Sequence, residues 1–133
     1  MTSTVTYLGE LRTEATHLFS GTKIITDAPL DNQGKAEAFS PTDLCATSLA
    51  TCALTIMGIS ARNHAFDMTG THAEVTKIMA ADPRRIAKVV IRFVMPQNDF
   101  TDTQKQILEK SARTCPVSFS LAEGVEQAME FVW

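Results

Sequence analysis

The side chains with the most chemical potential in this chain are its three cysteines, Cys45, Cys52 and Cys115. None of them forms a Cys-x-x-Cys pair, and an odd number in a chain without a secretion signal argues against a structural disulfide framework. The histidines do not stand at metal-ligand spacing with the cysteines, so we expect no metal site and no cofactor. Two interpretations remain for the cysteines: reactive thiols, whose thiolate acts as a nucleophile, or small apolar residues of the core.

Cys115 directly precedes Pro116, where the sequence predicts that a helix begins. Unpaired backbone N–H groups at a helix start favour a thiolate. Local physics therefore predicts that Cys115 is the more acidic thiol of the chain. The alternative interpretation is that Cys115 only caps the helix.

Cys52 lies about three turns into a long predicted helix, beyond the first turn in which the helix dipole acts. A thiolate at Cys52 therefore needs a nearby cation, and Arg12 is the candidate. The alternatives are that Cys52 is a small apolar residue of a buried helix and that Arg12 is an ordinary exposed strand residue. Cys45, seven positions before Cys52 on the same helix face, is too far from it for a disulfide and is interpreted as a core residue.

The helix that carries Cys52 has a strong start signal. Ser40 suits the cap, Pro41 suits the first helical position, and Asp43 stands where a capping box places its acid. The uncharged stretch that follows, Leu44 to Ala61, contains threonines, serines and alanines, so we interpret it as buried inside protein and not as a membrane span. A helix that is apolar nearly all round needs cover on every side, which favours a partner subunit.

The other elements follow from periodicity and turn signals. Short strands are expected at 3–8, 12–18 and 22–26, then a loop to residue 39, then the long helix. A long antiparallel hairpin is expected at 66–80 and 86–95, with a bulge near Gly70. Thr101 and Gln104 form a capping box for the next helix, a short helix follows Cys115, and residues 125–133 form a closing strand. This order predicts a single α+β domain over residues 1–133.

Two segments resemble the OsmC/Ohr family: Phe39-Ser40-Pro41-Thr42-Asp43-Leu44, leading to Leu49-Ala50-Thr51-Cys52, and Thr114-Cys115-Pro116-Val117-Ser118. The resemblance implies an OsmC/Ohr-type fold with antiparallel sheets around a long central helix, in an intertwined homodimer. It also implies a thiol peroxidase for organic hydroperoxides. In that scheme Cys52 attacks the peroxide and becomes a sulfenic acid. Cys115 then condenses with it to a disulfide, and a dithiol reduces this disulfide to restore both thiols.

The resemblance also implies an arginine and an acid that assist the first thiol. Arg12 is the candidate arginine. The position of the family's helper glutamate, directly after the proline, is Thr42 here, and the nearest acid is Asp43. The capping role is the leading alternative for Asp43.

Composition narrows the range of functions. The net charge is −3 and no basic run occurs, so nucleic acid is not an expected partner. The N-terminus lacks a signal-peptide pattern, so the cytoplasm is the expected compartment. An apolar pocket lined by residues such as Leu49, Ile56 and Phe119 would favour organic hydroperoxides. The alternatives are a non-catalytic or redox-sensing dimer that binds a small hydrophobic ligand and, last, an acyl-transfer enzyme that lacks an evident histidine base.

Overall fold

The computed structural model describes all residues from Met1 to Trp133. The order of its main elements is the predicted one: three strands, a long helix, two strands, two helices and a final strand. Contacts divide the chain into two compact units, Met1–Cys45 and Ala46–Trp133, which we describe separately. The prediction of a single domain stays a prediction.

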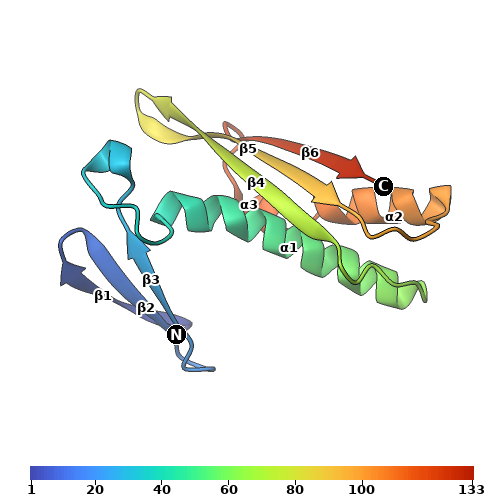
Figure 1. The fold of residues 1–133 in the computed structure, drawn as a ribbon, viewed down its shortest axis with the longest axis horizontal. Helices are drawn as coiled ribbons and strands as arrows, with labels where there is room; N and C mark the ends of the chain where they lie inside the picture. The colour runs from blue at the N-terminus through green and yellow to red at the C-terminus, as the bar shows by residue number, and fades with distance from the viewer. The chain divides into compact units, whose positions relative to one another are not determined.

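The first unit contains a three-stranded antiparallel sheet of β1 (Ser3–Gly9), β2 (Arg12–His17) and β3 (Lys23–Asp27), with β2 in the middle (Figure 1). Most of its side chains are exposed, and the buried residues at the end of β3 are polar: Thr26 and Asp27. Polar contacts therefore hold this unit together more than an apolar core does. A short 3₁₀ helix, η1 (Leu30–Asn32), lies in the loop after β3.

Helix α1 (Pro41–Asn63) begins where the sequence predicts. Ser40 Oγ accepts the Asp43 N–H at 3.1 Å, and Asp43 Oδ2 accepts the Ser40 N–H at 2.9 Å. This reciprocal pair is a capping box, which satisfies two backbone donors that the helix leaves unpaired. The predicted start of the central helix is confirmed.

The second unit contains a sheet in the order β4 (His72–Ala81), β5 (Arg84–Val94) and β6 (Glu126–Val132). Strands β4 and β5 are antiparallel, but β5 and β6 are parallel. The predicted α+β fold is confirmed, and this sheet is mixed where antiparallel sheets were expected. The chain reaches β6 through α2 (Asp102–Arg113) and α3 (Pro116–Ser120), and such a helical crossover permits parallel pairing.

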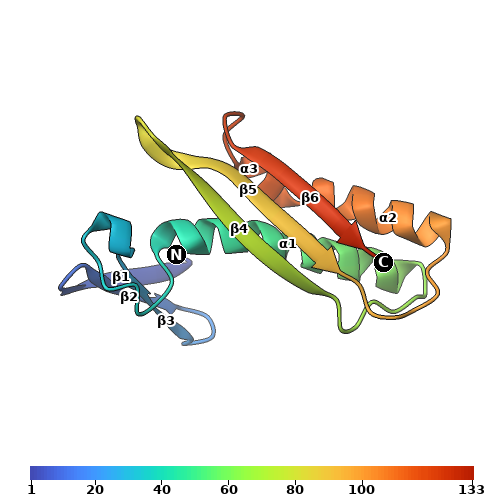
Figure 2. The same ribbon diagram turned by 45° about the horizontal axis from the view of Figure 1, so that its top comes forward.

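The helices of the second unit cover one face of its sheet (Figures 1 and 2). Phe93 of β5, Met57 of α1 and Leu108 of α2 are fully buried in a shared core. The opposite face of the sheet is charged: Lys88 pairs with Glu126 at 2.8 Å, and Arg92 pairs with Glu74 at 3.1 Å. The predicted alternation along the second hairpin strand is confirmed, with Val89, Ile91, Phe93 and Met95 buried.

The first hairpin strand is shorter than predicted. Strand β4 begins at His72, and before it Asp67 accepts the Thr69 N–H at 2.8 Å in a turn. Gly70 lies in this turn region with a φ of +94°, a conformation that favours glycine. The expected bulge near Gly70 is therefore wrong, because Gly70 precedes the strand. The register shift lies instead at Ile78 and Met79.

Helix α1 is long and apolar enough, by length and composition, to cross a membrane, with a mean hydropathy of 1.7 over its best window. A third of that window is buried inside the chain. The fully or nearly fully buried side chains follow one face: Ala46, Leu49, Ala50, Ala53, Met57 and Ala61. This face packs in the core of the second unit, as a core helix does.

Candidate functional site

The structure brings Cys52 and Cys115 together from distant parts of the sequence. Cys52 is half-buried on α1 and packs against the core cluster that contains the fully buried Cys115. The Cys52 side chain is close enough to act on the Cys115 thiol through a hydrogen bond and through charge. None of the three cysteines is in a disulfide. Along α1, Cys45 precedes Cys52 by about 10 Å of helix rise.

Cys115 caps the short helix α3, and its Sγ accepts the Ser118 N–H at 3.4 Å. Burial raises the pKa of the Cys115 thiol, against the lowering effect of the Ser118 N–H. The expectation that Cys115 is the more acidic thiol is therefore not met, because its pKa moves upward. The sequence shows the helix start, but it does not show that the sulfur has no exposed surface.

A polar cluster beside Cys115 was not predicted from the sequence. Ser118 of α3 and Gln127 of β6 share two hydrogen bonds. Arg113, at the end of α2, donates to the Met129 carbonyl at 3.0 Å, and its guanidinium lies 5.8 Å from the centre of the Phe131 ring. The segment that carries Cys115 is thus held to β6 on both sides. The sequence showed Gln127 only as one position on a strand face.

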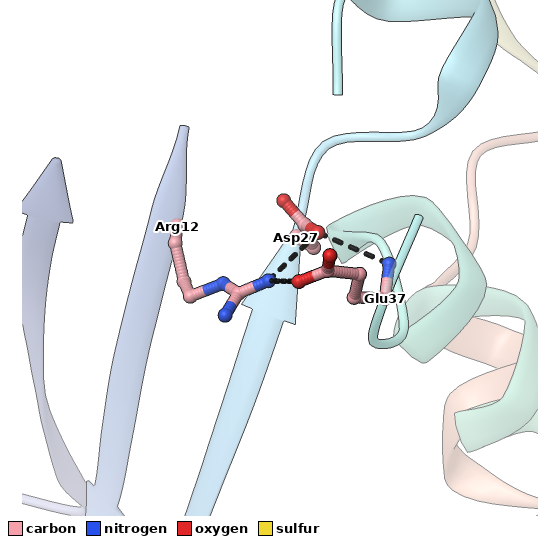
Figure 3. Close-up of polar contacts among 3 residues, drawn as sticks. All are labelled: Arg12, Asp27 and Glu37. Atoms are coloured by element: carbon pink, nitrogen blue, oxygen red, sulfur yellow. Dashed lines mark hydrogen bonds and ion pairs between the residues drawn. The ribbon is translucent and has the colours of Figure 1, made fainter. Parts of the chain in front are cut away.

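Arg12 belongs to a cluster of three charges in the first unit (Figure 3). Its Nη2 donates to Asp27 Oδ2 at 3.1 Å and to Glu37 Oε2 at 2.5 Å. Figure 3 shows the guanidinium from β2 meeting both carboxylates, which come from the end of β3 and from the following loop. One cation facing two anions leaves this cluster with a net negative charge.

Asp27 is the buried member of the cluster, with no exposed side-chain surface. Its pKa is held below the ordinary value, chiefly by the Glu37 N–H and further by the Arg12 side chain, although desolvation acts in the opposite direction. The hydrogen bonds to Glu37 and Asp27 also raise the pKa of Arg12. The cluster therefore favours the charged forms of both Arg12 and Asp27.

The loop that carries Glu37 is closely folded. The Ala36 N–H donates to the Ala28 carbonyl at 3.1 Å, and a Cβ on Gly34 would lie 1.7 Å from the oxygen of that same carbonyl. Only a residue without a side chain fits position 34. Asp27 and Glu37 were not predicted as functional residues, because each lies far from Arg12 in sequence and the loop carries no motif.

Asp43 uses a carboxylate oxygen in the capping box described above. The capping role of Asp43 is therefore confirmed, and its role as a catalytic helper stays a prediction. Thr42, at the position of the expected helper glutamate, has its Oγ1 3.1 Å from Ser40 Oγ. The acids that the structure gives to Arg12 are Asp27 and Glu37.

The predicted apolar pocket cannot include Leu49, and its lining by Ile56 and Phe119 stays a prediction. Leu49 has no exposed surface and is part of the core, whereas Phe119 is 74% exposed. A cavity of about 590 Å³ in the second unit lies farther along α1 and against the turn before β4. Its apolar lining includes Leu54, Ile59, Phe66 and Met68. No group of three or more His, Cys, Asp or Glu side chains is arranged to hold a metal ion.

Comparison with known proteins decides the family. The model of the OsmC-like protein family matches residues 34–130. The chain belongs to the OsmC-like family. A search of curated proteins found no significant match to this OsmC-like protein.

Solved structures agree with the family and the fold. A Psychrobacter arcticus protein, provisionally described as an osmotic stress induced and detoxification response protein, is 54% identical, with a TM-score of 0.94 over 98% of this chain and 95% of that one. An OsmC-like protein of unknown function from Vibrio cholerae is 14% identical, with a TM-score of 0.80 over 98% and 97% of the two chains. The organic hydroperoxide resistance protein of Bacillus subtilis is 18% identical, with a TM-score of 0.69 over 98% of each chain.

Proposed function

We propose that this OsmC-like protein is a cysteine peroxidase that reduces organic hydroperoxides through a thiol–disulfide cycle of Cys52 and Cys115. The observation that carries the proposal is the direct neighbourhood of these two thiols in the core of the second unit. A solved structure of the same fold belongs to a protein named for organic hydroperoxide resistance. The proposed compartment is the cytoplasm, where dithiol reductants keep such thiols reduced.

The difference in burial supports the proposed roles of the two cysteines. Cys52 is half-buried and can meet a substrate, whereas Cys115 has no exposed surface and can meet only Cys52. The Cys52 thiolate attacks one peroxide oxygen, the O–O bond breaks, and the alkoxide leaves as an alcohol after taking up a proton. Cys52 is then a sulfenic acid.

The second half of the cycle closes the disulfide. The Cys115 thiolate attacks the sulfenic sulfur of Cys52, an S–S bond forms, and hydroxide leaves as water after protonation. A dithiol then reduces the disulfide by two exchange steps and becomes a disulfide itself. Both protein thiols are restored.

Arg12 is the proposed cation for the Cys52 thiolate. Its guanidinium already binds Asp27 and Glu37, so it can stabilise a further anion only with nitrogens that these acids do not use. Arg12→Ala should slow the first oxidation of Cys52 in stopped-flow measurements. An unchanged rate would leave Arg12 with a structural role only.

We also propose that the protein works as an intertwined homodimer. Only a third of the most apolar window of α1 is buried within one chain. On the exposed stripe of α1, the Thr51 hydroxyl donates to the Ser48 carbonyl and the Thr55 hydroxyl donates to the Thr51 carbonyl. These threonines therefore present methyl groups outward, next to Ile59, which is 48% exposed. The first unit exposes further large apolar side chains, among them Val5, Tyr7, Leu11, Ile24 and Phe39.

Light scattering tests the dimer. The wild type should be dimeric at micromolar concentration, with an interface larger than the ~1,600 Å² of a standard complex. Thr55→Arg, in the exposed stripe of α1, should dissociate it, whereas Thr103→Arg on the exposed side of α2 should not. A stable wild-type monomer would rule out the assembly.

A second candidate function is a dimer that binds a small hydrophobic ligand without catalysis or as a redox sensor. The cavity of about 590 Å³ along α1 favours it, because its lining includes several apolar side chains. In this case Cys52 and Cys115 would respond to oxidation or would serve only as packing residues of the core.

Consumption of an organic hydroperoxide in the presence of a dithiol decides between the two functions. The wild type should consume it faster than hydrogen peroxide, because each buried methylene contributes about 0.8 kcal/mol to binding. Cys52→Ser should abolish turnover, and Cys115→Ser should allow one oxidation of Cys52 but block recycling through the disulfide. Cys45→Ser is the matched control and should retain turnover. Equal, slow rates for wild type and Cys52→Ser would favour the binding function.

A further inference from the structure

On the C-terminal side of Cys115, one glutamine binds the segment to strand β6. The Ser118 hydroxyl donates to Gln127 Oε1 at 2.7 Å, and Gln127 Nε2 donates to the Ser118 carbonyl oxygen at 3.0 Å. Because the two bonds run in opposite directions, they fix the orientation of the Gln127 amide as well as the position of Ser118. Gln127 is half-buried in a strand that is hydrogen-bonded to β5 along its whole length.

Ser118 also contacts the Cys115 thiol directly. Its backbone N–H donates to Cys115 Sγ at 3.4 Å. Gln127 thus holds the carbonyl and the hydroxyl of the residue whose amide is directed at the sulfur. Cys115 has no exposed surface, so bulk solvent offers it no substitute donor.

The chemistry at Cys115 depends on such a donor. A hydrogen bond from an N–H group to sulfur favours the thiolate over the thiol. In the proposed cycle the Cys115 thiolate attacks the sulfenic sulfur of Cys52, and it is also a leaving group when the disulfide is reduced. In both steps a well-directed N–H stabilises the negative charge on sulfur.

We propose that Gln127 is a positioning residue for Cys115, whose side-chain amide holds Ser118 so that the Ser118 N–H stays directed at the Cys115 sulfur. Its importance in turnover rests on the proposed function. Its effect on the Cys115 thiol does not, because the contacts exist without peroxide. The effect of Gln127 on the Cys115 thiol and its effect on turnover can therefore be tested separately.

Titration of the Cys115 thiol is the first test. In a Cys45→Ser, Cys52→Ser background, Cys115 is the only thiol, and the ultraviolet absorbance of its thiolate can be followed against pH. Gln127→Met keeps the length of the side chain and loses both hydrogen bonds. We expect about a tenfold lower thiolate fraction at a given pH, which corresponds to roughly one unit on the pH axis. Glu130→Gln, on the other face of β6, is the matched control and should leave the titration unchanged.

Single-turnover kinetics with all three cysteines present are the second test. Gln127→Met should slow disulfide closure about tenfold, while formation of the Cys52 sulfenic acid proceeds as in the wild type. Ser118→Ala loses only the hydroxyl bond and should have a smaller effect. The combined variant should be no slower than Gln127→Met, because both residues act through one chain of contacts.

The outcomes separate the two proposals. A Gln127→Met protein that melts at a lower temperature but titrates like the control would overturn the positioning role and make Gln127 merely structural. If Gln127→Met does not fold, Ser118→Ala decides the question by the same titration. A shifted titration of Cys115, together with a wild-type protein that consumes no hydroperoxide, would support the positioning role and contradict the proposed function.

Discussion

The thiol pair and the arginine cluster each contain a buried ionisable group, but the favoured charge state of that group differs between them. Cys115 lies in an apolar core, where burial raises its pKa and the thiol is favoured. Asp27 is just as buried, but an N–H group and a guanidinium keep it charged. The second unit is therefore held by apolar packing and the first by ionic contacts. Ionisation of Cys115 should cost stability at alkaline pH, whereas protonation of Asp27 should cost stability in acid. The following changes test the contrast between the two regions.

The largest expected effect on stability comes from the apolar core of the second unit. Phe93 is fully buried in the core of the second unit and stacks on Phe131 with 5.0 Å between ring centres. Phe93→Ala should lower the free energy of unfolding by about 3–5 kcal/mol in denaturant titrations. Phe19, in the first unit, is 97% exposed, and Phe19→Ala should change it by less than about 0.5 kcal/mol. A large loss from Phe19→Ala would show that this side chain is covered in solution.

Disulfide closure should depend strongly on pH. Because burial raises the pKa of Cys115, the thiol is the main form at neutral pH. Below that pKa the rate of closure, measured after a single oxidation of Cys52, should rise about tenfold per pH unit. A rate that is flat across neutral pH would mean that another group takes the proton before attack.

A smaller effect is expected in acid, from the arginine cluster. The pKa of Asp27 is lower in the folded than in the unfolded chain, so its stabilising contribution is present above the ordinary aspartate pKa and is lost as the pH falls through the lowered value. In the Asp27→Asn variant, the melting temperature should therefore fall less as the pH is lowered than it does in the wild type. Glu130→Gln, measured alongside, controls for the loss of one negative charge.

The smallest effect is expected at the surface of the first sheet. Lys23 pairs with Glu14 at 2.8 Å, and both side chains are partly exposed. Lys23→Ala should lower the free energy of unfolding by no more than about 0.5 kcal/mol, and the difference should shrink in high salt. A loss above about 1 kcal/mol would place this pair in a buried interface.

The order of elements was predictable because its signals are local. Ser40 and Asp43, like Thr101 and Gln104, mark helix starts within four residues, and both capping boxes are present in the structure. The pairing of β6 with β5 was not predictable in this way. Whether two distant strands run parallel depends on the path of the chain between them and not on the residues of either strand.

The candidate site was predicted only in part, for a similar reason. Cys52 and Cys115 stand in motifs, so they were found, and the structure brings them together. The partners that set their surroundings carry no motif. Glu37 lies in a loop and Gln127 in a strand, and each contacts its target through the fold alone. Burial is likewise a property of the fold, which is why the pKa of Cys115 was predicted in the wrong direction.

The close approach of Gly34 to Ala28 has a consequence for comparing related sequences. A side chain at position 34 would collide with the backbone that brings Glu37 to Arg12. A relative that keeps this ion cluster must therefore have a glycine three residues before its loop glutamate, or a loop of another length. In a relative with a loop of the same length, a residue other than glycine at this position therefore indicates, from sequence alone, that no acid of this loop holds the strand arginine.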